Sequence, residues 1–419
     1  MNVWPCGRLI SSVLRKFGAN IDTKKTICSS PFELNAACPS VFWASGDGPY
    51  DNTRKALANI DLTPAKDKRV LLKPNAGRNA EPKTGVTTHP QVVAAAIDAF
   101  REAGAEIALG ESPITGVKAL EAFESSGIAS IARQRNCPLI DMDERRFIPI
   151  EITGGVAIKS LKLCREIVEY DIVVSIPVMK THMHTGVTLS VKNMKGCLWR
   201  RSKVDLHMLP EIDGYQEKPL DIAIADMTSV LRPGLSIIDG TIGMEGLGPS
   251  AGTPKPLGVV VVGVDAFAAD SIACELMGIS AGDISHLRMG AERGYGVIDL
   301  DKISVSPENW KEVRSPFTLS PEKLSLEFPG FTILDEQSCS ACQSTLLMFL
   351  KQHGKQLLDE RTDDKDIVIA IGKGHEKLPE GTLCVGNCTA MHKKSRAFVP
   401  GCPPVASEIL NEYFKMVEK

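Results

Sequence analysis

The chain has 419 residues, of which 43% are apolar and 24% charged, with a formal net charge of −3. This composition is typical of a folded globular protein and excludes general disorder, and the length predicts more than one domain. The slight negative charge and an aromatic content of 5% argue against a nucleic-acid-binding surface.

The first 47 residues show little periodicity, and we expect residues 1–47 to form a loosely ordered lead-in. Ser11 and Ser12 interrupt their apolar stretch, so this segment lacks the continuous apolar core of a secretory signal. The longest strongly apolar run, Leu257–Val264, is far shorter than the roughly 20 residues of a membrane helix. We therefore expect a cytoplasmic protein with neither a membrane nor a nucleic acid as partner.

Strands and helices alternate from about residue 68. We predict a buried strand over 69–75, a helix over 91–103 with Thr88 as its N-cap, and a strand over 106–110. The pattern continues with a helix over 120–135, strands over 138–141 and 171–176, a helix over 220–231, strands over 235–239 and 257–264, a helix over 266–277, and a closing strand over 303–305. The continuous apolar strands predict an α/β fold with a mostly parallel sheet and flanking helices.

A change of pattern near residues 307–322 predicts a domain boundary, because Pro307, Pro316 and Pro321 interrupt the periodicity there. We expect a large α/β domain over 48–310 and a smaller, cysteine-rich α/β domain over 311–419. The small domain is predicted to contain a helix over 342–353, strands over 366–371, 381–385 and 396–399, and a helix over 405–417.

Five of the 12 cysteines fall within 64 residues of the small domain. A cluster of thiols in a chain without a secretory signal is more typical of a metal or redox site than of disulfides. Cys339 and Cys342 begin one predicted helix and Cys402 precedes another, where free N–H groups favour an anionic cluster. We therefore predict a 4Fe-4S cluster held by Cys339, Cys342, Cys388 and Cys402, with Cys384 as a core thiol.

Other interpretations of these cysteines remain open. Zinc also accepts four thiolates, although zinc ribbons usually present two CxxC pairs and the second pair is missing here. Unligated core cysteines are another alternative, as is a redox dithiol formed by Cys339 and Cys342 alone. Cys384 could also replace one of the four ligands.

Polar residues follow the predicted strands of the large domain, at the positions where open α/β sheets bind ligands. The candidates for binding an anion are Lys73, Asn75, Lys180, His182, Lys192, Asn193 and Lys195. Cationic and amide side chains bind carboxylate or phosphate groups, so we predict a small anionic substrate. His182 and His184 are two residues apart, which also permits a metal pair, and a solvated loop is the remaining alternative.

A glycine-rich segment follows the predicted strand 235–239, with glycines at 240, 243, 246 and 248. It matches neither the GxGxxG fingerprint nor a P-loop, so a nucleotide site is unsupported. Glu245 in this segment and Asp265 at the start of the next helix are candidate acid–base or metal-binding groups. A tight turn and a helix N-cap are the respective alternatives.

Several of these segments together resemble the domain-of-unknown-function 362 family. The motifs are Lys73-Pro-Asn, Gly110-Glu-Ser, Met179-Lys-Thr-His, Val191-Lys-Asn-Met-Lys-Gly, Asp239-Gly…Glu245-Gly…Gly-Pro and Val264-Asp…Ala269-Asp, in this order over about Lys68–Val305. Members of that family are often described as uncharacterised iron–sulfur centre proteins, and many carry ferredoxin-like cysteine runs. This chain has the dispersed cysteine set in place of a tandem run. The resemblance implies the fold and an iron–sulfur cofactor, but no established reaction.

Three functions fit these observations. The first is a 4Fe-4S protein with a redox role, such as an oxidoreductase, that binds a small anionic substrate in its α/β domain. The second is a non-catalytic electron carrier or cluster-bearing adaptor that docks on a redox partner protein. The third is a metal-dependent lyase or isomerase with a structural metal site and a second metal near His182 and Glu245. No flavin or nicotinamide fingerprint is recognisable, so the sequence identifies no electron donor.

Overall fold

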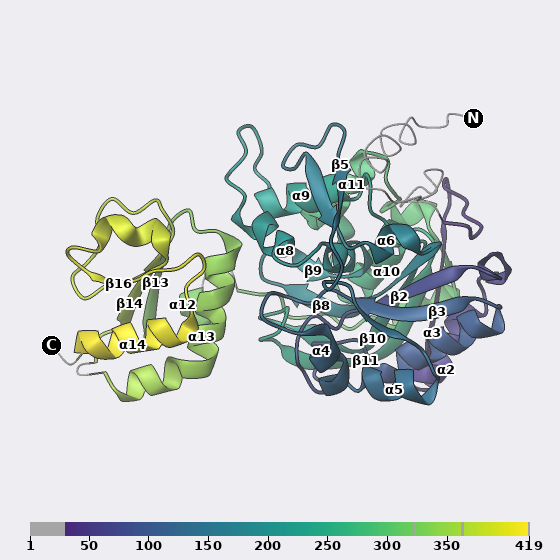
Figure 1. Cartoon of the computed structure of the whole chain (residues 1–419), viewed down its shortest axis with the longest axis horizontal. Coiled ribbons are helices and arrows are strands. Elements are labelled where there is room, and N and C mark those ends of the chain that lie inside the picture. The colour runs from purple at the N-terminus through teal and green to yellow at the C-terminus, as the bar shows by residue number, and fades with distance from the viewer. Residues whose placement is uncertain (1–29, 322–323, 362–363, 418–419) are drawn as a thin grey trace. The chain divides into compact units, whose positions relative to one another are not determined.

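The computed structural model describes residues 30–321, 324–361 and 364–417, which divide into two units (Figure 1). The large unit runs up to Leu206 and continues over Glu211–Ser320, and the small unit comprises His207–Pro210 and the chain from Pro321 onward. The boundary thus lies beyond the predicted one at residue 310. The reason is that Ser315 and Phe317 donate backbone hydrogen bonds to the end of a large-unit helix, at Leu276 and Met277. Among the described residues, no helix is long and apolar enough to cross a bilayer.

A ten-stranded sheet forms the centre of the large unit, with the strand order β12-β1-β11-β10-β7-β2-β3-β4. Five neighbouring strands run parallel: β10 (Leu235–Glu245), β7 (Ile172–Ile176), β2 (Arg69–Pro74), β3 (Glu106–Glu111) and β4 (Leu139–Asp141). The remaining strands of this order are β11 (Thr253–Gly263), β1 (Ser40–Ser45) and β12 (Ser304–Ser306), and β11 is antiparallel to both of its neighbours. The predicted α/β fold with a mostly parallel sheet is confirmed.

Helices cover both faces of this sheet, as its apolar strands require. The helices α2 (Pro49–Leu57), α3 (Pro90–Glu102) and α5 (Ile128–Gln134) share a core with Val260 and Val262 of β11. The opposite face of β11 packs against α10 (Ala266–Leu276), because a Cβ at Gly263 would lie 3.2 Å from the Cβ of Ala269. Val259 and Val261, which alternate with the first pair, are also fully buried.

Two short strands extend the sheet beside β10. They are β8 (Val178–His182), which follows β7 after one residue, and β9 (Gly186–Thr188), which pairs with β8. The other elements of the large unit are the helices α4 (Ala119–Ser125), α6 (Glu166–Glu169), α7 (Ser190–Asn193), α8 (Ser202–Asp205), α9 (Pro219–Met227) and α11 (Ser285–Glu292), and the strand pair β5 (Ile148–Glu151) and β6 (Ser160–Leu163).

The large unit differs from the prediction in three places. The helix expected over 120–135 is divided into α4 and α5, because Gly127 adopts a left-handed conformation with φ 75°. The glycine-rich segment continues β10 as far as Glu245, in a hairpin with β11, instead of turning at residue 240. Residues 40–45 of the expected lead-in form β1, which pairs with both β11 and β12. Residues 1–29 of that lead-in lie outside the described residues.

The small unit is built on a four-stranded parallel sheet with the order β13-β14-β15-β16. Its strands are β13 (Phe331–Asp335), β14 (Ile367–Ile371), β15 (Leu383–Val385) and β16 (Ala397–Val399), and its helices are α12 (Leu324–Glu327), α13 (Ser340–Asp359) and α14 (Ala406–Val417). Phe349 of α13 and Tyr413 of α14 pack against Ile369 and Ile371 of β14 in one core. The edge strand β13 was not predicted from the sequence.

Candidate functional site

Lys73 and Glu111 form a buried ion pair where β2 and β3 end side by side. The Nζ of Lys73 lies 2.9 Å from Oε2 of Glu111, and the two side chains are 1% and 2% exposed. The Glu111 carboxylate also accepts hydrogen bonds from the backbone N–H groups of Ala76 and Ser112. The charge of Lys73, a predicted anion ligand, is thus already neutralised, and the pair ties two neighbouring strand ends together.

Asn193 makes every hydrogen bond of which its amide is capable. Its Oδ1 accepts from Lys73 Nζ and from Asn75 Nδ2, both at 3.1 Å. Its Nδ2 donates to the backbone oxygen of Lys73 at 3.2 Å and to the hydroxyl of Ser175 at 3.1 Å. These bonds fix the end of α7 against the carboxyl ends of β2 and β7, so Asn193 and Asn75 position the site.

The start of α7 is also held in place, by a carboxylate from the neighbouring helix α10. Asp270 of α10 is fully buried, and it accepts from the backbone N–H groups of Ser190 at 2.7 Å and Val191 at 2.9 Å. Burial raises the pKa of Asp270 to about 8, and the two N–H groups oppose that shift. After α7, Gly196 packs directly on the ion pair: a Cβ there would lie 2.6 Å from both Lys73 Nζ and Glu111 Oε1.

Lys180 is a buried cation whose hydrogen-bond partners are all uncharged. It lies on β8, is 3% exposed, and donates to Asn75 Oδ1 at 2.8 Å and to the backbone oxygen of Val86 at 2.7 Å. A longer contact of 3.4 Å reaches the backbone oxygen of Pro249. Burial, followed by the nearby charges of Lys192 and Arg78, lowers the pKa of Lys180 well below its usual value.

Lys192 adds a further amine near Lys180, and Lys195 lies near Lys192 and Lys203. Burial lowers the pKa of Lys192 to about 7, and the charge of Asp221 opposes this shift. Asp221 is itself engaged, because one of its oxygens lies 3.0 Å from Nδ1 of His286. Burial, followed by the charges of Lys192 and Lys203, lowers the pKa of Lys195 well below its usual value.

Two cations of this site, Arg78 and Lys203, were not predicted from the sequence. Burial lowers the pKa of the Arg78 guanidinium, which reflects the cost of holding its charge away from water. Lys203 is buried and donates to the hydroxyl of Ser112 and to the backbone oxygen of Leu198, with Asp143 at 3.8 Å. A signal for Lys203 existed in the basic run 200–203, but such a run more often forms a solvated surface.

The site therefore gathers several basic groups whose charged forms are disfavoured by burial. We call the group of Arg78, Lys180, Lys192 and Lys195 the cation cluster. Two buried hydroxyls near it, those of Thr87 and Thr188, have no hydrogen-bond partner, and Thr188 is the cross-strand neighbour of Lys180. Partly desolvated cations and unpaired hydroxyls can donate hydrogen bonds to the oxygen atoms of an anion such as a carboxylate or phosphate.

The two predicted histidines lie together but face one another. Nδ1 of His182 accepts from the backbone N–H of His184 at 3.1 Å, and their ring centroids are 5.5 Å apart. Over residues 30–321, 324–361 and 364–417, no three His, Cys, Asp or Glu side chains are grouped so as to hold a metal ion. The predicted metal pair thus has no third ligand at hand, and His182 borders the site as a buried polar group.

Glu245 and Asp265, the predicted acid–base groups, both make structural contacts. Glu245 accepts from the backbone N–H of Thr318 at 2.9 Å and lies 3.5 Å from Nζ of Lys255. Asp265 is the N-cap of α10, where its Oδ1 accepts from the backbone N–H groups of Phe267 and Ala268 at 2.8 and 3.1 Å. The predicted chemical role of each stays a prediction, and these contacts do not require it. Likewise, the observed N-cap of α3 is His89 and not Thr88.

In the small unit, three parallel strands lead to the four predicted cluster ligands. After β13 the chain reaches Cys339 and Cys342 at the start of α13, after β15 it reaches Cys388, and after β16 it reaches Cys402. Their thiols act electrostatically on one another, which places them in one neighbourhood at the carboxyl edge of the sheet. A hydrogen bond from the Cys342 thiol, supported by backbone N–H groups at the helix start, lowers the pKa of Cys339 to about 6.

The four thiols suit an iron–sulfur cluster, because such clusters are held by cysteine thiolates. The N–H groups at a helix start also favour the negative charge of the cluster. Gly386 adds room there, since a Cβ at this position would lie 3.4 Å from Sγ of Cys342. The thiols do not converge into one cage, however, because no metal-holding group of three such side chains is found in the described part of the chain. Cys384 is fully buried, packs with Ala370 and Leu378, and has its pKa raised to about 11 by burial.

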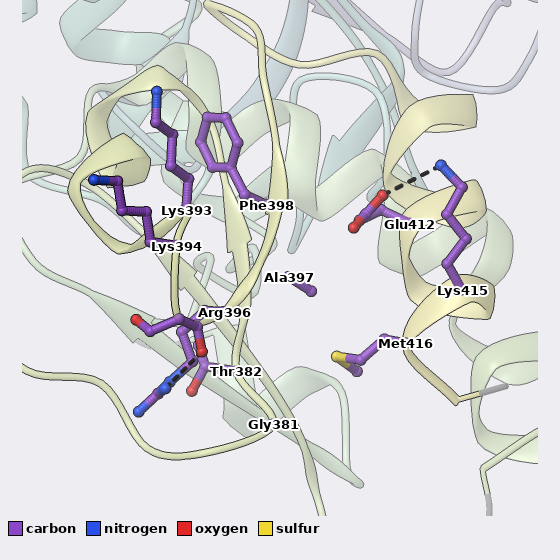
Figure 2. Close-up of a pocket in the computed structure, with 11 residues that line it drawn as sticks. Gly381, Thr382, Lys393, Lys394, Arg396, Ala397, Phe398, Glu412, Lys415 and Met416 are labelled. Atoms are coloured by element: carbon purple, nitrogen blue, oxygen red, sulfur yellow. Dashed lines mark hydrogen bonds and ion pairs between the residues drawn. The ribbon is translucent and has the colours of Figure 1, made fainter. Parts of the chain in front are cut away.

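A basic pocket lies at the opposite, amino-terminal ends of β15 and β16 (Figure 2). It has a volume of about 800 Å³, and its lining includes Lys393, Lys394, Arg396 and Lys415. Glu412, the acidic lining residue, is paired with Lys415 at 3.4 Å, as Figure 2 shows. The guanidinium of Arg396 donates to backbone oxygens alone, including those of residues 378 and 379 at 2.7 Å.

Comparisons with known proteins give one family and two similar proteins. The profile of a family described as "Domain of unknown function (DUF362)" matches residues 70–275. The thylakoid-associated protein sll1697 of Synechocystis sp. is 29% identical over 229 residues, which cover 55% of this chain and 68% of that protein. The lactate racemase apoprotein of Thermoanaerobacterium thermosaccharolyticum is similar at a TM-score of 0.39 and 14% identity, over 59% of this chain and 60% of that one. The family match includes the cation cluster and ends before the cysteines of the small unit.

Proposed function

The chain belongs to the DUF362 family through residues 70–275, and from this premise we propose that it is an iron–sulfur protein with a redox role that binds a small anionic substrate. The observation that carries the proposal is the cation cluster: Lys180 and Lys192 are buried, Lys195 and Arg78 are half-buried, and the nearby carboxylates of Glu111 and Asp221 already contact Lys73 and His286. A ligand that brings its own negative charge completes this arrangement.

The energetics favour an anion over water in this site. An ammonium group that is buried without a counter-ion has a lowered pKa, because its charged form has lost its hydration. Burial lowers the pKa values of Lys180 and Lys192 in this way. A carboxylate or phosphate restores the missing charge partner, so its binding is coupled to proton uptake by these amines. The unpaired hydroxyls of Thr87 and Thr188 supply additional donors for its oxygens.

Ligand-induced stabilisation tests the anion site. None of the chain's four tryptophans, at positions 4, 43, 199 and 310, falls within the small-unit segments His207–Pro210 and Pro321 onward, so tryptophan fluorescence follows the large unit. Phosphate or pyruvate at about 100 times its Kd should stabilise the wild type by about 2.7 kcal/mol. The Lys180→Met variant should lose this effect, while Lys118→Met, a control whose side chain is 79% exposed, should keep it. Equal stabilisation of all three proteins, or of none, would contradict the proposal.

We further propose that Cys339, Cys342, Cys388 and Cys402 hold a 4Fe-4S cluster, which would supply one-electron chemistry. Support comes from the four thiols at one sheet edge and from the lowered pKa of Cys339, which favours its thiolate form. Cys388 and Cys402 are exposed, so a redox partner can approach from solvent. Anaerobic preparations should contain about four iron and four acid-labile sulfide per chain. One zinc without sulfide would contradict the cluster.

The second candidate function is a non-catalytic electron carrier that docks on a redox partner protein. The basic pocket of the small unit favours it, because Lys393 and Lys394 are exposed cations that an acidic protein surface can contact. In that case the Lys393→Glu/Lys394→Glu variant should slow electron transfer to an acidic partner with no change in anion binding by the large unit. An unchanged transfer rate at low salt would remove this candidate.

A further inference from the structure

Lys192 differs from the other buried lysines of the site in its hydrogen bonding. The amines of Lys73, Lys180 and Lys203 each donate to at least two oxygen atoms. Within the described ranges 30–321, 324–361 and 364–417, the Lys192 amine makes neither a hydrogen bond nor an ion pair. When this amine is uncharged, its lone pair is therefore available for reaction.

The backbone that carries Lys192 is fixed on both sides. Asp270 binds the N–H groups of the two preceding residues, Ser190 and Val191. Asn193, the next residue, is held by four hydrogen bonds to Lys73, Asn75 and Ser175. An amine without partners on a backbone held this firmly is pre-organised for attack, because little further ordering is needed when a ligand arrives.

The surroundings of Lys192 favour its uncharged form. The elements packed against α7 carry the charged residues Asp270 and Glu275 on α10, Asp239 and Glu245 on β10, and Lys195 just after α7. The charges of Lys180 and Asp221 also act on this amine. Burial outweighs the opposing charge of Asp221 and lowers the pKa of Lys192 to about 7. About half of these amines are thus uncharged at neutral pH, the condition under which a lysine acts as a nucleophile.

We propose that Lys192 is a nucleophile that forms an imine with a 2-oxo acid bound in the cation cluster. This inference rests on the proposed anion-binding function and names its substrate class. Lys180 and Arg78, whose charges act on one another, would hold the carboxylate. A 2-oxo acid carries its electrophilic carbonyl carbon one bond from that carboxylate, within the reach of a neighbouring amine.

The step needs no oxidant or reductant. The Lys192 nitrogen attacks the carbonyl carbon to form a C–N bond, and the carbonyl oxygen takes up a proton to give a carbinolamine. The hydroxyl then leaves as water together with the remaining amine proton, which solvent or a neighbouring amine relays to it, and a C=N bond is left. The positive charge of a protonated imine would be balanced by the bound carboxylate.

Borohydride trapping tests the proposal on the full-length protein, with pyruvate as the probe. Hydride addition to the imine carbon makes the adduct permanent, and peptide mass spectrometry should locate it on Lys192. The Lys192→Arg variant should lose the adduct, whereas Lys118→Arg, a control at an exposed lysine outside the site, should keep it. Trapping on exposed lysines such as Lys118 to the same extent as on Lys192 would overturn the inference.

The amine-reactive anion trinitrobenzenesulfonate gives a second measurement that requires no substrate. Labelling of Lys192 should rise about 50-fold between pH 5 and pH 7 and then level off, as expected for a pKa of about 7. A labelling rate that still climbs tenfold per unit above pH 8 would overturn the inference. If pyruvate stabilises the large unit but is not trapped, Lys192 is no nucleophile and the anion site stands. If neither pyruvate nor phosphate binds, the proposed function fails and this inference fails with it.

Discussion

Replacing Glu111 by glutamine should destabilise the large unit strongly, although the shape of the side chain hardly changes. The substitution leaves the buried ammonium of Lys73 without its counter-ion. At a separation of 2.9 Å and an effective dielectric constant of about 20, the lost attraction is about 6 kcal/mol. Lys73 keeps its hydrogen bonds to the backbone oxygen of Pro74 and to Asn193, which offsets part of the loss. We expect a net cost of about 3–4 kcal/mol, in the range for breaking one side of a buried pair.

Urea unfolding followed by tryptophan fluorescence measures this cost in the large unit alone. Glu124→Gln is the matched control, because it removes the same charge from an exposed ion pair with Arg133, where we expect a change below about 1 kcal/mol. The double variant Lys73→Met/Glu111→Gln should recover part of the lost stability, since no unpaired charge remains. A Glu111→Gln variant as stable as the Glu124→Gln control, or a double variant whose losses simply add, would refute this reasoning.

Three further predictions follow from the site. Gly196→Ala should cost about 1–3 kcal/mol, because its Cβ would press on the buried ion pair, whereas Gly282→Ala, whose Cβ would meet its nearest neighbour at 3.5 Å, should change little; equal urea midpoints would contradict this. Cys388→Ala should lower the iron content and Cys384→Ala should not, and a loss in the second variant would make that residue a ligand. Because burial lowers the pKa of Lys192 to about 7, the unfolded chain binds more protons between about pH 7 and pH 10. Lys192 should therefore contribute up to about 1.4 kcal/mol per pH unit to a rise in the stability of the ligand-free large unit over that range, and Lys192→Met should remove this share.

The sequence predicted the parallel strands well, since a strand buried on both faces must be continuously apolar. The strands β2 and β7 are such runs, and both lie where the apolar pattern placed them. The continuation of β10 through its glycines was not predicted from the sequence, because glycine favours turns by its local conformational preference. In the folded chain these glycines allow close packing: a Cβ at Gly243 would lie 2.8 Å from the backbone oxygen of Met179.

The sequence predicted those residues of the candidate site that follow a buried strand, but not the contacts they make. Lys180 and Lys192 were found because donors after a buried strand point to the ligand edge of a parallel sheet. The neutralisation of Lys73 could not be foreseen, since it depends on β2 lying next to β3 and on the register that brings Glu111 alongside. Arg78 was missed because its loop position carries no periodic signal, and its burial results from the folded chain around it.

The central claim is that the large unit binds an anion through buried, partly discharged amines. Calorimetric titration with inorganic phosphate at pH 8, in two buffers with different heats of ionisation, measures the protons taken up on binding. The account predicts saturable binding with net proton uptake, which Lys180→Met should abolish or sharply reduce, because an anion restores the pKa of the buried lysines. The claim would be contradicted if phosphate did not bind. It would also be contradicted if phosphate bound without proton uptake and Lys180→Met left that binding unchanged.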